Sequence, residues 1–266
     1  MASPLRPTLL LLVAATAGAL TLRPGPRAPG ETLPAPGEAA AAPIPVAPTP
    51  VAPTPVAPAP APAAPAALSV TLNAAILDLL PEYSKADSPP YVWSRGQDTD
   101  GVTRELRWQG TLLAAPDSTG GIHCSGITYE VYLRALASVV GDGQGPDAAT
   151  LLALKETWYV RDGDERGPVD ALANAGLGQR VSGLAAFKPG DIVQFWRNSG
   201  KGHSVIFINH TRNSDGSVRG MTYWSAQGTS GGIGMRRTSP GSDINQIAPD
   251  RLYGVRPVWP GTWPAR

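Results

Sequence analysis

Proline is distributed so unevenly along this chain that the sequence must fold as two unlike parts. Seventeen of the 29 prolines lie within residues 1–67, where Ala and Thr supply much of the remainder and no aromatic residue occurs. Proline fixes φ and has no backbone N–H, and a segment without large apolar side chains cannot bury a core. Residues 68–266 have an ordinary globular composition, and 199 residues suit one domain.

The first part has the pattern of an export signal followed by a tether. Residues 1–22 carry Arg6 and an apolar run, and small residues at 17–19 offer a cleavage site after Ala19. An uncleaved membrane anchor is the alternative interpretation. Residues 23–67, with VAPTP at 46–50 and again at 51–55, predict a stiff polyproline-like linker, either a spacer or an inert connection. We therefore expect a bacterial protein that is periplasmic, attached to the cell envelope or secreted.

Charge and cysteine content exclude several classes of protein. Three of the 22 Lys and Arg residues and two of the 21 Asp and Glu residues precede residue 68, so the domain carries 19 charges of each sign. A neutral domain argues against a dedicated nucleic-acid binder. Cys124 is the only cysteine, which excludes an intramolecular disulfide and the common cysteine-based zinc sites. We expect no metal and no cofactor, and a monomer.

Hydrophobic periodicity predicts helices in the first half of the domain. A helix runs from Leu72 to a stop at Pro81, and residues 91–120 form loops with a short strand. Apolar residues four apart predict a largely buried helix from Cys124 to Val140, ended by Gly141. Two more helices are expected at 147–158 and at 168–176.

The second half changes to the two-residue period of strands. Strands are expected at 192–196, 204–209 and 221–225, and Asn213–Gly216 is a hairpin loop between the last two. A helical half followed by an antiparallel half predicts an α+β fold.

Cys124 is the candidate nucleophile. It follows a glycine-rich loop, Gly120-Gly121-Ile122-His123, and begins the predicted helix. Unpaired amides and the dipole at a helix N-terminus favour a thiolate, and the same amides can hold the oxyanion that forms when it attacks a carbonyl. The alternative is that Cys124 is a small buried hydrophobic residue without a catalytic role, but such a structural role does not need a glycine-rich loop.

His203 is the candidate base. It opens a predicted strand, and by strand parity it shares a face with Val205 and Phe207, whereas His210 lies on the other face. We expect Gly202 to allow close approach to His203, and His210 to cap the hairpin at the surface. His123 precedes the nucleophile and should point away from it, as a structural residue.

Three segments resemble the NlpC/P60 superfamily of papain-like cysteine peptidases and amidases. They are GGIHCSGITYEVYLRAL, FKPGDIVQFWRNSGKGHSVIFI and YWSAQGTSGGIGM, and together they cover about residues 120–235. The resemblance implies a papain-like fold in which Cys124 is the nucleophile and His203 the base, with Pro189-Gly190-Asp191 as the turn before the first core strand. It implies a polar third member one strand later, which is Gln227 or, as the alternative, Ser225.

The chain departs from the family pattern in three places. His123 stands where the family usually has Asp, residues 141–186 form a long helical insertion, and Gln227 carries no charge. Family members often add an oxyanion donor upstream of the cysteine, and Gln97 and Tyr91 are the candidates here. Among the tryptophans, Trp196 is the candidate wall of the cleft.

The sequence thus predicts an exported cysteine hydrolase that cleaves peptide or amide bonds, with peptidoglycan as the substrate that the resemblance implies. Two alternatives remain open. One is a secreted amidase or toxin that acts on substrates outside the wall, and the other is a wall-binding module without activity. The Cys124–His203 pair favours the enzymes over the binding module.

Overall fold

The structure is a computed structural model, and it describes residues 70–83, 88–93, 99–118, 120–141, 144–161, 163–228 and 231–263. The predicted signal peptide (1–22) and linker (23–67) lie outside these ranges, as does Gln97. In chain order, the helices and 3₁₀ turns are α1 (Asn73–Leu79), η1 (Leu80–Glu82), α2 (Cys124–Val140), α3 (Ala148–Trp158), α4 (Pro168–Asn174) and η2 (Leu184–Ala186).

The described strands form two sheets. The smaller is the hairpin of β2 (Leu106–Trp108) and β3 (Thr111–Ala114). The larger has the order β1-β9-β5-β6-β7-β8, with β4 also paired to β9. Its strands are β1 (Val70–Thr71), β4 (Gly178–Val181), β5 (Ile192–Arg197), β6 (Gly202–Arg212), β7 (Val218–Gln227), β8 (Gly232–Thr238) and β9 (Ile247–Trp259).

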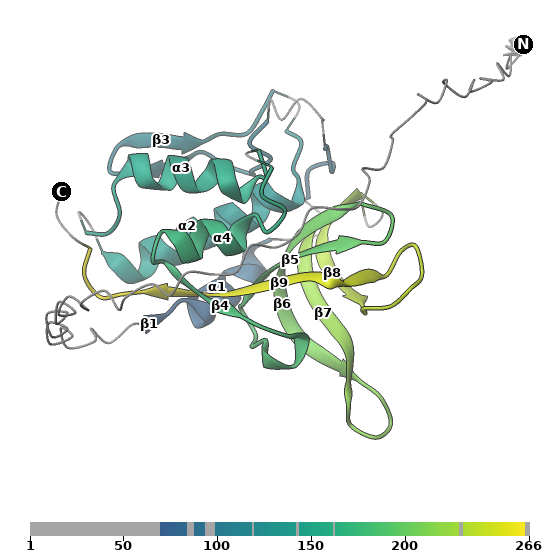
Figure 1. The fold of residues 1–266 in the computed structure, drawn as a ribbon. Helices are drawn as coiled ribbons and strands as arrows, with labels where there is room; N and C mark the ends of the chain where they lie inside the picture. Colours follow the sequence, from purple (N-terminus) through teal and green to yellow (C-terminus); the bar gives the residue numbers. More distant parts are fainter. Residues whose placement is uncertain are drawn as a thin grey trace, which may run out of the picture. The chain divides into compact units, whose positions relative to one another are not determined.

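Helices α2, α3 and α4 gather on one side of the molecule, and strands β5 to β8 gather on the other (Figure 1). All pairings of the larger sheet are antiparallel. The long strand β9 runs under both groups and pairs with β1 and β4 at one end and with β5 at the other (Figure 1). The expected α+β class is therefore observed.

The helices agree with the periodicity. Helix α2 has the expected bounds, and it ends where Gly141 adopts φ 77°. Asp147 caps α3 by accepting a hydrogen bond from the Thr150 amide. Pro81 does not stop the first helix outright, because a proline is tolerated in the first turn of a helix and α1 continues into η1.

The strands are longer and more numerous than the sequence predicts. The insertion at 141–186, expected to be helical, contains β4, which adds a strand to β9. Strands β8 and β9 were not expected. In β9, Arg256 and Pro257 interrupt the run of apolar residues, so the sequence pattern does not indicate a strand there. The strand forms because β9 pairs with β1, β4 and β5, which are distant from it in sequence.

Two apolar clusters use opposite faces of the central strands. Ile192, Ile206 and Trp224 face α2 and belong to the larger cluster. Val205, Phe207 and other residues on the alternate positions form a smaller cluster on the second face. The strand alternation predicted for β6 is therefore correct from His203 to Phe207.

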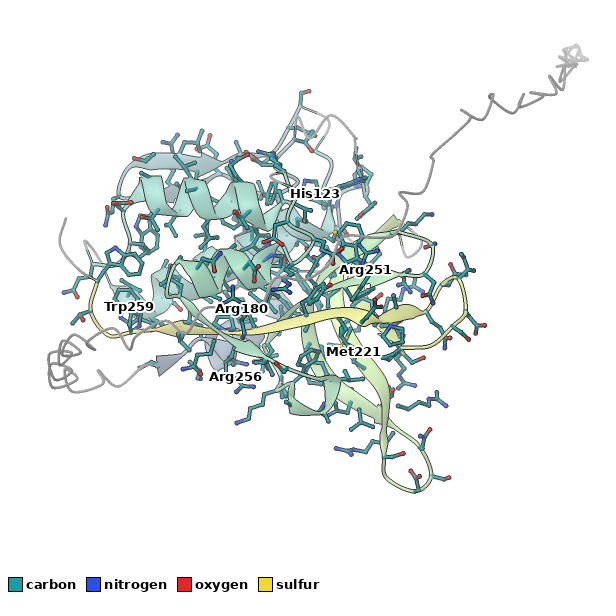
Figure 2. The ribbon with its side chains drawn as sticks, viewed as in Figure 1. His123, Arg180, Met221, Arg251, Arg256 and Trp259 are labelled. Carbon is teal, nitrogen blue, oxygen red and sulfur yellow. The ribbon has the colours of Figure 1, made fainter. Side chains whose placement is uncertain are left out.

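Asp191 of the Pro-Gly-Asp turn joins three elements. Its carboxylate is completely buried and forms a salt bridge with Arg256 of β9, at 2.9 Å. It also accepts hydrogen bonds from Asn73 Nδ2 of α1 and from the Lys188 amide. Figure 2 shows Arg256 on the face of β9 where these elements meet. The turn thus ties the first helix to the sheet.

Candidate active site

The first turn of α2 is held by contacts with neighbouring residues. His123 is the N-cap, and its Nδ1 accepts a hydrogen bond from the Gly126 amide at 3.0 Å. A Cβ at Gly126 would lie 2.2 Å from the Asp100 carbonyl oxygen, so only glycine allows the 100–101 backbone to pack there. Cys124, the first helical residue, is 5% exposed.

Two backbone amides at this helix start remain available. The Gly126 amide is bonded to His123 Nδ1, and the Ile127 amide to the His123 carbonyl. In the described part of the chain, the N–H groups of Cys124 and Ser125 donate to no backbone carbonyl, and that of Cys124 faces the Tyr91 hydroxyl in the cavity. Such groups, together with the helix dipole, stabilise negative charge beside the sulfur.

Hydroxyl groups connect the start of α2 to the central strands. Ser125 Oγ lies 3.3 Å from Ser204 Oγ, and Ser204 Oγ donates to Gln194 Oε1 at 2.6 Å. All three residues are buried. This contact places the helix N-terminus next to the start of β6, where His203 lies.

Cys124 and His203 line the same cavity, which has a volume of about 650 Å³. Four aromatic side chains from three segments form much of its wall, namely Tyr91, Trp93, Tyr159 and Trp196. Val160 also lines it and has φ 60°, a strained conformation for a β-branched residue. Strain of this kind concentrates at functional sites.

His203 sits in an apolar environment within this site. Its ring makes edge contacts with Phe195 and Tyr223, at centroid distances of 5.6 and 5.7 Å. Burial, with the positive charge of Arg197 as the smaller cause, lowers the pKa of His203 to about 3. Its Nε2 has no hydrogen-bond partner among the described residues. The imidazole is therefore neutral at pH 7.

Tyr91 contacts the nucleophile directly. Its Oη donates to Cys124 Sγ at 3.8 Å. The backbone holds it there, because Tyr91 bridges to Ile122 and the Val92 amide donates to the Ile122 carbonyl. Burial and, to a lesser extent, the charge of Cys124 raise the pKa of Tyr91, so its hydroxyl keeps its proton. Tyr91 is one of the two oxyanion candidates from the sequence, and in the structure it lines the cavity with Cys124 and His203.

The residues named for the third position differ in their contacts. Ser225 is fully buried, and its Oγ donates to the Ser204 carbonyl at 2.8 Å, a bond between adjacent strands. Gln227 accepts a hydrogen bond from Tyr223 Oη at 3.1 Å. Continuing the Ile206–Trp224 register by three residues places Gln227 level with His203. Tyr223 therefore contacts both His203 and Gln227.

Trp196 lines the cavity, as the sequence predicts, and contacts with Glu165 and Arg251 hold its ring in place. Its Nε1 donates to the Glu165 carbonyl at 2.7 Å, and the Arg251 guanidinium lies 4.7 Å from its ring. A Cβ at Gly202 would lie 3.0 Å from the Trp196 ring, so the close approach expected at Gly202 is that of the tryptophan. Arg251 lies in the half of β9 that is away from Trp259 (Figure 2).

The other two histidines lie outside the cavity lining. His123 is the N-cap of α2, and its ring is in edge contact with Trp93 and Tyr159, which line the cavity. His210 is not a hairpin cap: it is half-buried within β6, and its Nε2 is 2.9 Å from the Leu184 carbonyl oxygen. A register shift between Phe207 and Asn209 breaks the alternation, and the His210 ring contacts Phe207. The parity argument therefore fails at His210.

The sequence did not indicate that Lys201, Tyr159 and Val160 line the cavity, or that Tyr223 contacts His203. Tyr223 had one available signal, since it alternates with Ser225 and Gln227 on β7. Lys201 is exposed at the cavity and is a cation among aromatic residues. Tyr159 and Val160 follow α3 in the insertion, and nothing in their spacing indicates a cleft.

Comparison with known proteins provides no relative: no family model, no curated protein and no solved structure matches this chain. Within the described ranges, His, Cys, Asp and Glu form no group that could hold a metal ion. The helices of those ranges also include none that is long and apolar enough to cross a membrane.

Proposed function

We propose that this protein is a cysteine hydrolase of the NlpC/P60 type, with a papain-like arrangement in which Cys124 is the nucleophile and His203 the base. The observation that carries the proposal is the shared cavity: a thiol at the first residue of a helix and a neutral imidazole at the start of a strand line the same space. The resemblance of the three sequence segments makes peptidoglycan peptide or amide bonds the proposed substrate.

The proposed reaction begins when an imidazole nitrogen of His203 takes the proton of the Cys124 thiol. The sulfur attacks the substrate carbonyl carbon, and the resulting oxyanion receives hydrogen bonds from the amides of Cys124 and Ser125 and from Tyr91 Oη. As the C–N bond breaks, the imidazolium protonates the leaving amine, and a thioester remains on Cys124. Water, deprotonated by His203, then attacks the thioester, releases the acid and restores the thiol.

The first experiment digests purified peptidoglycan with the full chain and identifies the released fragments by mass spectrometry. Cys124→Ala should abolish release while circular dichroism shows an intact fold, and His203→Gln should reduce the rate on the order of 10²-fold or more, the usual scale for a general base. Full activity in Cys124→Ala would rule out a cysteine hydrolase. Cleavage of small amides or proteins with the wall left intact would support the secreted amidase instead.

The third position is tested with matched variants on β7. If Gln227 orients His203 with the help of Tyr223, then Gln227→Ala and Tyr223→Phe should each lower kcat, and the double variant should lose little more than either single variant. Ser225→Ala should lower the free energy of unfolding and leave kcat nearly unchanged, because its bond is to a strand backbone. A loss of kcat only in Ser225→Ala would assign the third position to Ser225.

A further inference from the structure

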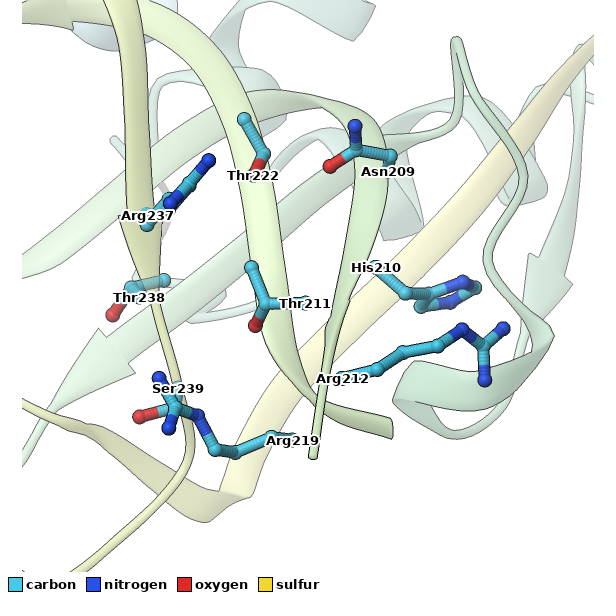
Figure 3. Close-up of a pocket in the computed structure, with 9 residues that line it drawn as sticks. All are labelled: Asn209, His210, Thr211, Arg212, Arg219, Thr222, Arg237, Thr238 and Ser239. Atoms are coloured by element: carbon cyan, nitrogen blue, oxygen red, sulfur yellow. The ribbon is translucent and has the colours of Figure 1, made fainter. Parts of the chain in front are cut away.

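A second hollow lies on the sheet, across β6, β7 and β8. It has a volume of about 510 Å³, and its lining is polar (Figure 3). We call it the arginine groove and define it by Asn209, Thr211, Arg219, Thr222, Arg237 and Ser239. His210 and Arg212 also line the hollow, but their side chains extend to the other side of β6 (Figure 3), and we leave them out of this definition.

Strand register builds the floor of the groove. Asn209 pairs with Thr222, and Thr222 pairs with Arg237, which forms one row of polar side chains across three strands. In the next row, Thr211 pairs with Gly220, where a Cβ would lie 2.9 Å from both Thr211 Oγ1 and the Ser239 Cβ. The glycine leaves these two hydroxyl residues open to a ligand above them.

The two arginines of the groove are not paired with any residue that the structure describes. Among the described residues, neither Arg219 nor Arg237 makes a salt bridge or a side-chain hydrogen bond, and no carboxylate lines the groove. Asp215, in the adjoining hairpin loop, is occupied by Ser217, whose hydrogen bonds lower the pKa of Asp215. Arg180, by contrast, is paired with Asp170.

The groove is separate from the cavity that holds Cys124 and His203. Asn209 is six residues beyond His203 on β6, and a strand advances about 3.3 Å per residue, so the two sites are about 20 Å apart. A ligand in the groove therefore does not occupy the cavity.

We propose that the arginine groove binds an anionic polysaccharide through phosphate or carboxylate groups carried along the polymer. Guanidinium groups bind both kinds of oxyanion through paired N–H donors, and hydroxyl and amide side chains beside them suit sugar hydroxyls. Arg237 near the end of β8 and Ser239 just beyond that end are two residues apart, about 7 Å in extended chain, so successive donors face successive groups of an extended polymer.

The chemistry of the groove favours a polysaccharide over a nucleic acid. Among the described residues that line it, there is no Trp, Tyr or Phe on which a base could stack. The domain also lacks the excess positive charge of a nucleic-acid binder. Because the proposal concerns binding at a separate site, it stands independently of any activity at Cys124.

The test measures binding of the full-length Cys124→Ala protein to four immobilised probes: polyphosphate, polygalacturonate, neutral dextran and single-stranded DNA. We expect binding to polyphosphate or polygalacturonate, with the stronger of the two identifying the anion, and none to dextran. Arg219→Ala combined with Arg237→Ala should weaken that binding at least tenfold and flatten its dependence on salt concentration.

A control pair removes the same net charge elsewhere. Arg107→Ala combined with Lys188→Ala changes two exposed cations outside the groove and should leave binding within about twofold of the parent protein. Circular dichroism and thermal melting should show both pairs folded. Equal losses in the two pairs, tighter binding of DNA than of either polyphosphate or polygalacturonate, or no binding to any probe would each overturn the proposal.

Discussion

At the scale of single residues, burial decides how the histidines of this protein titrate. His123 and His203 are almost completely enclosed, and burial is the main cause that lowers their pKa values to about 4 and about 3. An exposed imidazole has a pKa near 6.5. Both side chains are therefore neutral in the folded protein under conditions where the unfolded chain begins to bind protons.

This difference predicts a loss of stability in mild acid. Below pH 6.5 the unfolded chain binds protons at His123 and His203 that the folded protein does not, so the free energy of unfolding falls as the pH falls toward 4. Each proton contributes a slope of up to about 1.4 kcal/mol per pH unit. Urea unfolding at pH 7.5, 6 and 5 measures this slope. His203→Gln should reduce the slope by the contribution of about one bound proton. Parallel curves for the two proteins would contradict a buried, neutral His203.

At the scale of secondary-structure elements, turn conformation controls the β2–β3 hairpin. The two residues between the strands, Gln109 and Gly110, have φ values of 48° and 82°, as a type I′ turn requires. Glycine adopts this conformation freely, but glutamine does not. The hairpin is joined to α3, because Lys155 Nζ of α3 donates to the carbonyl of Leu113 in β3. Helix α3 in turn leads into Tyr159 and Val160 of the cavity lining.

Replacing Gln109 with a residue suited to this turn should stabilise the protein. We expect Gln109→Asn to raise the free energy of unfolding on the order of 0.5 kcal/mol, since Asn-Gly is the preferred pair for a type I′ turn. Gln109→Val should lower it, because a β-branched residue disfavours positive φ. Denaturation by urea checks both changes. A Val variant as stable as the Asn variant would show that this turn places no conformational demand on residue 109.

At the scale of the whole molecule, one buried carboxylate connects elements from the beginning, middle and end of the domain. Asp191 is completely buried and bonds to Asn73 and Arg256, whereas the Arg256 side chain is 18% exposed. Removing the Arg256 guanidinium would leave the Asp191 carboxylate buried without its positive partner. Removing the carboxylate would leave a cation that can reach water.

The two substitutions should therefore have unequal effects. Arg256→Met should cost about 3 kcal/mol of unfolding free energy or more, and Asp191→Asn should cost less. As a control, Arg180→Met breaks the more exposed pair with Asp170 and should cost less than about 1 kcal/mol. Chemical denaturation compares the three variants. Equal losses for Arg256→Met and Arg180→Met would mean that the buried pair does not hold the domain together.

Local features of this protein could be predicted from the order of its residues. Helix α2 has the bounds that its four-residue apolar steps predict, and the α+β class follows from the change of period, because both signals come from residues close together in the chain. The start of the helix at Cys124 and the start of β6 near His203 were visible for the same reason.

Only the tertiary structure decided which of these features meet. Long-range pairing brings β9 between β1 and β5, the register shift in β6 redirects His210, and packing against β5 and β7 encloses His203. Tyr223 beside Gln227 and the unpaired arginines across β7 and β8 also depend on register between strands. Periodicity within one segment carries no information about its partners, so contacts between distant segments, and the pKa values that burial changes, become known only from the folded chain.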